Sequence, residues 1–124
     1  MSADLLRRAL NTAPGSPTRG TVVFDAARAR VVHPGGAIEF ARRRVVKELL
    51  LALAAAGGDV VPKEALARTL FARYEPGRHD AILRVNLGRL RATLRAAGIG
   101  VAFKAGGYYL VTPPGFVYAR PDGG

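Results

Sequence analysis

HDAILRVNLGRLRATLRAAG, residues 79–98, is the stretch that decides the fold. At 100° per residue its larger apolar side chains fall on one narrow stripe of a helix. The stripe consists of Leu83, Leu87, Leu90, Leu94 and Ala97. Asp80 is a suitable N-cap, and Gly98 is a suitable residue to follow the last turn. We therefore predict a long amphipathic helix over residues 80–97.

The face opposite this stripe is basic and otherwise built from small residues. It carries Ala81, Val85, Gly88, Arg89 and Ala92, flanked by Arg84, Arg91 and Arg95. A helix that only covers a core normally shows a mixed or acidic face to water, yet no acidic residue follows Asp80 in this stretch. Such a face is typical of a helix that lies in the major groove of DNA.

Length and composition limit the class of protein. With 124 residues, 49% of them hydrophobic, the chain is long enough for one domain with its own core. The absence of cysteine excludes disulfides, zinc–thiolate sites and cysteine nucleophiles. No N-terminal apolar run approaches the length of a signal peptide or a membrane span, so we expect a cytoplasmic protein with no membrane contact.

The formal net charge of +10 favours a polyanionic partner. Arginine dominates the basic residues and suits bidentate contacts to phosphate and guanine, but a GC-rich genome gives the same excess, and both explanations stay open. The two histidines are isolated and the acidic residues are scattered, which leaves no acid–base pair or metal cluster to name. We expect no enzyme activity, no metal and no cofactor.

The rest of the chain supplies strands, two shorter helices and turns. Residues 1–20 contain a Pro, Gly, Ser and Thr cluster and are expected to form a flexible N-terminal segment. Alternating patterns predict strands at 21–25, 28–32, 37–40, 101–104 and 108–111, and helical patterns predict helices at 42–56 and 63–74. His33 is expected in an exposed turn, residues 75–78 in a loop, and residues 113–124 in a C-terminal tail.

This order predicts an α+β fold. It has an N-terminal antiparallel sheet, three helices and a C-terminal hairpin, which together make a winged helix-turn-helix over residues 21–112. Arg42, Arg43 and Arg44 stand at the start of the first predicted helix. We interpret them as a solvated charge run, with phosphate contact as the alternative.

The order of these elements and several short sequence motifs resemble the OmpR/PhoB-type winged-helix DNA-binding domain of response regulators. The stretches that carry the resemblance are FDAARARVVHPGGAIEF, GGDVVPKEAL, LRVNLGRLRATL and FKAGGYYLV, within about residues 21–112. The last two are the most specific. The resemblance implies sequence-specific binding to double-stranded DNA by a transcriptional regulator.

The chain departs from the family pattern at several positions. Arg84 replaces a usual acidic residue and Gly88 a common basic one, so we expect it to read a different DNA sequence. Pro62 stands where a serine N-cap is common, and the Thr-Glu pair that typically opens the first core helix is missing. The 20 residues before the module are too few for a receiver domain, so the family's switch by phosphorylation is not expected.

The predicted site follows from these residues. Arg84 and Arg89 are the candidates for guanine, Val85 for a thymine methyl, and Gly88 for close backbone approach, all as base contacts. The candidates for backbone contacts are Arg78, Asn86, Arg91 and Arg95. Lys104, in the hairpin over residues 101–111, stands where family members place a basic residue near the minor groove.

Other partners stay open. The same basic face fits an acidic protein surface, which would make the chain a protein-interaction module, or structured RNA. The resemblance also implies possible contact with RNA polymerase through loop 74–79 and a homodimer on DNA.

Overall fold

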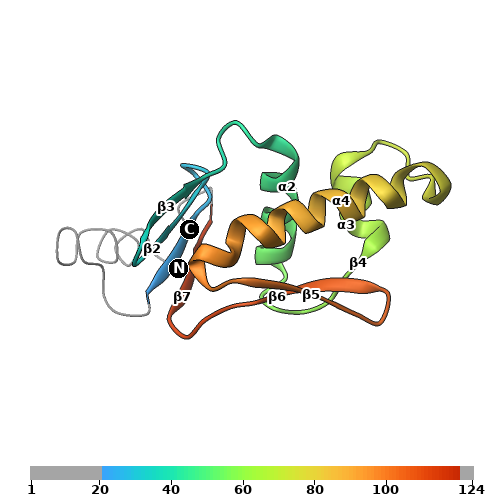
Figure 1. Cartoon of the computed structure of the whole chain (residues 1–124). Helices are drawn as coiled ribbons and strands as arrows, with labels where there is room; N and C mark the ends of the chain where they lie inside the picture. The colour runs from blue at the N-terminus through green and yellow to red at the C-terminus, as the bar shows by residue number, and fades with distance from the viewer. Residues whose placement is uncertain (1–20, 121–124) are drawn as a thin grey trace.

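The computed structural model describes residues 21–120 (Figure 1). Its first sheet has four strands. Strands β1 (Val22–Asp25), β2 (Arg30–His33) and β3 (Gly36–Glu39) are antiparallel neighbours, as predicted. The expected flexible segment 1–20 lies outside the described residues.

A fourth strand, β7 (Phe116–Ala119), was not predicted. It pairs in parallel with β1, so the sheet order is β3-β2-β1-β7. The ring of Tyr118 stacks on that of Phe24 with centroids 5.4 Å apart, and Phe116 packs against the core. Part of the stretch predicted as a C-terminal tail therefore belongs to the sheet.

The prediction that His33 lies exposed in a turn is wrong. His33 is the last residue of β2, and it is buried. Its Nδ1 accepts a hydrogen bond from the backbone N–H of Gly35 at 3.1 Å. The imidazole therefore stabilises the turn between β2 and β3 by accepting this bond.

Three helices follow: α2 (Arg44–Ala55), α3 (Lys63–Leu70) and α4 (Pro76–Leu94), which a 3₁₀ turn at Arg95–Ala97 extends. The predicted apolar stripe of the long helix is confirmed, since all five of its side chains are buried. On α2 the buried residues are Val46, Leu49, Leu50, Leu53 and Ala54. Gly98 ends the long helix at a φ of +73°, in the left-handed region that favours glycine.

The second sheet contains the predicted hairpin. Strands β5 (Gly100–Lys104) and β6 (Gly107–Val111) are antiparallel, and a short strand β4 (Val61–Pro62) adds to β6. Ala105 and Gly106 have φ values of +52° and +79°, which gives the tight turn whose twist matches the strands. A Cβ on Gly107 would lie 2.5 Å from the carbonyl oxygen of Val61, so only glycine lets β4 approach.

The molecule is thus α+β, with three helices and two sheets in the described part. Helix α4 crosses α2, and the β5–β6 hairpin runs alongside α4 (Figure 1). This arrangement buries the leucine face of α4 and leaves the opposite face exposed. Within residues 21–120 no helix is long and apolar enough to cross a membrane.

Candidate nucleic-acid interface

Helix α4 begins one turn earlier than the sequence predicts. Glu75 is the N-cap and Pro76 the first helical residue, which is where proline is favoured because its missing N–H has no partner there anyway. The prediction of Asp80 as N-cap is therefore wrong, and so is a loop over 75–78. Arg78 lies in the first turn and pairs with Glu75 at 3.2 Å.

His79 takes the place of a conventional cap. Its Nδ1 accepts a hydrogen bond from the backbone N–H of Glu75 at 3.0 Å, which satisfies a donor at the helix start. Its ring stacks on Phe71, with centroids 3.9 Å apart and planes 5° from parallel. The residues between α3 and α4 are thereby held against the first turn of α4.

Asp80 joins α4 to α3 instead of capping the helix. Its carboxylate accepts hydrogen bonds from the Tyr74 hydroxyl and from Lys63 Nζ, the latter at 3.1 Å. The bond from Tyr74, and then that from Lys63, lowers the pKa of Asp80. The bond to Asp80 in turn raises the pKa of Tyr74 and of Lys63. Asp80 is the last acidic residue before Asp122, and its carboxylate is thus already paired with Lys63.

A line of small side chains runs along the centre of the exposed face of α4. Its members are Ala81, Val85, Gly88 and Ala92. Val85 is 53% exposed, and a Cβ built on Gly88 meets nothing within 4 Å. The packing of the protein therefore does not require glycine at position 88, and the space above this line is open.

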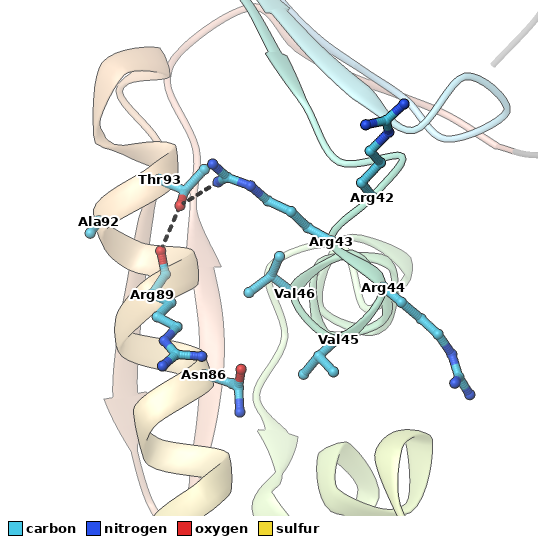
Figure 2. Close-up of a pocket in the computed structure, with 9 residues that line it drawn as sticks. All are labelled: Arg42, Arg43, Arg44, Val45, Val46, Asn86, Arg89, Ala92 and Thr93. Carbon is cyan, nitrogen blue, oxygen red and sulfur yellow. Dashed lines mark hydrogen bonds between the residues drawn. The ribbon is translucent and has the colours of Figure 1, made fainter.

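Arginines stand on both sides of that line. Arg84 is on the hairpin side, where it lines a cavity of about 390 Å³ together with Phe103 and Tyr108. Arg89 is on the other side, where it faces the start of α2 (Figure 2). Both side chains are exposed, and neither forms an ion pair with another described residue.

The predicted backbone-contact residues differ in how free they are. Arg91 donates its Nε to the carbonyl oxygen of Val101 in β5 at 2.8 Å, and Asn86 donates to the carbonyl of Ile82 one turn earlier at 2.8 Å. Arg78 is paired with Glu75. Arg95 is exposed, and within residues 21–120 its side chain makes no hydrogen bond or ion pair.

Lys104 is the last residue of β5, exposed and next to the turn at Ala105. Its neighbour Phe103 is 61% exposed, with its ring edge against Tyr108 at a centroid distance of 5.2 Å. The sequence analysis did not single out Phe103. The alternation of β5 places Phe103 on the same face as buried Val101, but it gives no sign that Phe103 is exposed.

The segment expected to contact RNA polymerase, 74–79, is a loop only at Tyr74 and Glu75, because α4 begins at Pro76. Among the described residues, no three His, Asp or Glu side chains gather where they would hold a metal ion. In comparisons with known proteins, no family model, no curated protein and no solved structure matches the chain.

Proposed function

We propose that this protein binds double-stranded DNA in a sequence-specific way, as a winged helix-turn-helix of the OmpR/PhoB type that regulates transcription. In this proposal α4 lies in the major groove and the β5–β6 hairpin lies at the minor groove or its phosphates. The observation that carries the proposal is the exposed face of α4, where small side chains form the centre and arginines form both flanks.

The small side chains at the centre of this face suit the major groove. The groove is about 12 Å wide and admits a helix of about 10–12 Å diameter only with close contact. A central line of alanine, glycine and valine lets the helix axis approach the bases, whereas long central side chains would hold it away. Gly88 supports this reading because nothing inside the protein occupies the space of its missing side chain.

The flanking side chains supply the chemistry. The guanidinium of Arg84 or Arg89 matches the O6 and N7 acceptors of guanine, and Val85 offers a methyl contact to thymine. Arg78, Asn86, Arg91 and Arg95 would lie nearer the phosphates, which position the protein without reading sequence. Arg91 also braces the hairpin, since its Nε is held by Val101.

The electrostatics of this surface favour a polyanionic partner. No acidic residue occurs between Asp80 and Asp122, so the exposed half of α4 and the whole hairpin carry positive charge alone. Duplex RNA fits less well, because its A-form major groove is too narrow for a helix. An acidic protein surface remains the rival that experiment must exclude.

The test is the salt dependence of binding to labelled DNA duplexes, for the wild type and for Lys104→Ala. If the wild type contacts phosphates, the logarithm of its binding constant should fall linearly with the logarithm of the salt concentration, with a slope of about −0.9 per phosphate contact. Loss of Lys104 should weaken binding to all duplexes alike and reduce that slope by about one.

Three results would count against the proposal. The first is no binding to duplexes, and the second is equal competition by an acidic protein and by DNA. The third is a preference for duplex RNA over DNA. Superimposed salt lines for wild type and Lys104→Ala would remove only the hairpin from the interface.

A further inference from the structure

A basic groove lies where α4 crosses the start of α2, on the side of α4 away from the hairpin. It has a volume of about 600 Å³. Its lining residues are Arg42, Arg43, Arg44, Val45, Val46, Asn86, Arg89, Ala92 and Thr93. Four of these nine residues are arginines, and none of the ion pairs among residues 21–120 involves any of them.

One of these arginines is held in place from the opposite wall. Arg43 reaches across the groove, and its Nη1 donates a hydrogen bond to Thr93 Oγ1 at 3.2 Å (Figure 2). The same Thr93 hydroxyl donates to the carbonyl oxygen of Arg89 at 2.8 Å, which orients its lone pairs toward Arg43. Arg42 and Arg44 point away from α4 (Figure 2).

We propose that this groove binds one phosphodiester of the DNA strand that borders the major groove on the α2 side, with Arg43 as the contacting residue. The proposal rests on the proposed function. A helix in the major groove has a phosphate strand on each side. The hairpin serves one side, and this groove is the basic feature on the other.

The chemistry of the groove suits a phosphate. An arginine fork offers several N–H donors at fixed angles, and Arg43 uses only Nη1 on Thr93. Its remaining donors stay available to the oxygens of a phosphodiester. Arg89 adds a second positive charge from the opposite wall, on α4. Thr93 acts as a positioning residue, because it fixes the guanidinium before DNA arrives and so reduces the entropy lost on binding.

The experiment replaces single phosphates of a bound duplex by uncharged methylphosphonates, one position at a time. With the wild type, one or two adjacent positions on one strand should each weaken binding about tenfold. With Arg43→Ala the duplex should bind about tenfold more weakly, and those same positions should lose their effect, because the contact is already gone. The salt slope should fall by about one.

Two variants serve as controls. Arg120→Ala removes the same charge at an exposed residue just after β7, outside the lining of the groove, and it should keep the wild-type sensitivity at every phosphate. Thr93→Val keeps the shape of the side chain and the charge of Arg43, so the salt slope should stay as in the wild type while affinity falls about threefold. If Thr93→Val only destabilised the fold, it would not lower the affinity for the duplex at an unchanged salt slope.

The outcomes distinguish the two proposals. If wild-type binding responds to methylphosphonates but Arg43→Ala responds at the same positions and to the same extent, the groove does not hold a phosphate, while DNA binding by α4 stands. If no position affects the wild type, or no duplex binds, both proposals fail.

Discussion

The side chain of Arg91 in α4 donates its Nε to the backbone carbonyl of Val101 in β5 at 2.8 Å, so the exposed helix and the hairpin are tied together. Val101 pairs with Leu110 in the neighbouring strand, which extends the tie to the whole hairpin. Arg91, which the sequence analysis assigns to phosphate contact, thus also stabilises the packing of the hairpin on α4.

We expect Arg91→Ala to lower the free energy of unfolding by about 1 kcal/mol, because it removes one charge-assisted hydrogen bond at a partly exposed site. Arg95→Ala is the matched control, since it removes the same charge from a side chain that has no bond within residues 21–120. That variant should stay within about 0.5 kcal/mol of the wild type. Urea denaturation measures both, and equal stabilities would show that the Arg91 bond contributes nothing.

Leu90 and Val85 test the rotation of α4. Leu90 is fully buried, so Leu90→Ala should cost about 2–5 kcal/mol of stability through lost burial and the cavity left behind. Val85 is 53% exposed, and Val85→Ala should change stability by less than about 0.5 kcal/mol. Thermal unfolding of the two variants would contradict the structure if their order were reversed.

Gly88→Ala should affect folding and binding in opposite directions. A methyl group at position 88 meets nothing within 4 Å, so alanine should stabilise the helix by about 0.5–1 kcal/mol. The same methyl group would stand between α4 and the bases, so duplex affinity should fall. Unfolding and duplex titration are measured on one preparation, and a stabilised variant with unchanged affinity would place this face outside the interface.

The Asp80 network predicts a pH dependence. Hydrogen bonds from Tyr74 and Lys63 lower the pKa of Asp80. They therefore stabilise the fold at pH values above the ordinary pKa of a carboxyl group, where Asp80 is ionised. This contribution is lost as the pH falls through the lowered pKa, below about pH 4. Asp80→Asn should therefore be less stable than the wild type at pH 7, and the gap should narrow in acid. A gap that is constant between pH 7 and pH 3 would contradict the assignment.

Local patterns predicted most of the elements. The leucine spacing gave the buried face of α4, and Ala105-Gly106 gave the hairpin turn. The start of α4 was misplaced because Pro76 and Gly77 usually mark a loop, whereas here proline occupies the first helical position and His79 supplies the cap. Both are local effects, but the second depends on a side chain reaching back along the chain.

Features that join distant residues were out of reach. The pairing of β7 with β1 brings Phe116 beside Val22, and nothing in a short stretch after Pro-Pro-Gly indicates that partner. The bond between Arg43 and Thr93 spans 50 positions and depends on how α2 crosses α4. The three arginines at the start of α2 are visible in the sequence as a charge run, but their neighbour across the groove is not.

The central claim is that the exposed face of α4 reads bases. Its most direct test is selection of bound duplexes from a fully randomised library, with the wild type and with Arg84→Ala. The account predicts a fixed consensus for the wild type. With Arg84→Ala it predicts a loss of about 1–3 kcal/mol on that site and a relaxed preference at one base pair. Equal losses on the consensus and on random DNA, or no wild-type consensus at all, would contradict it.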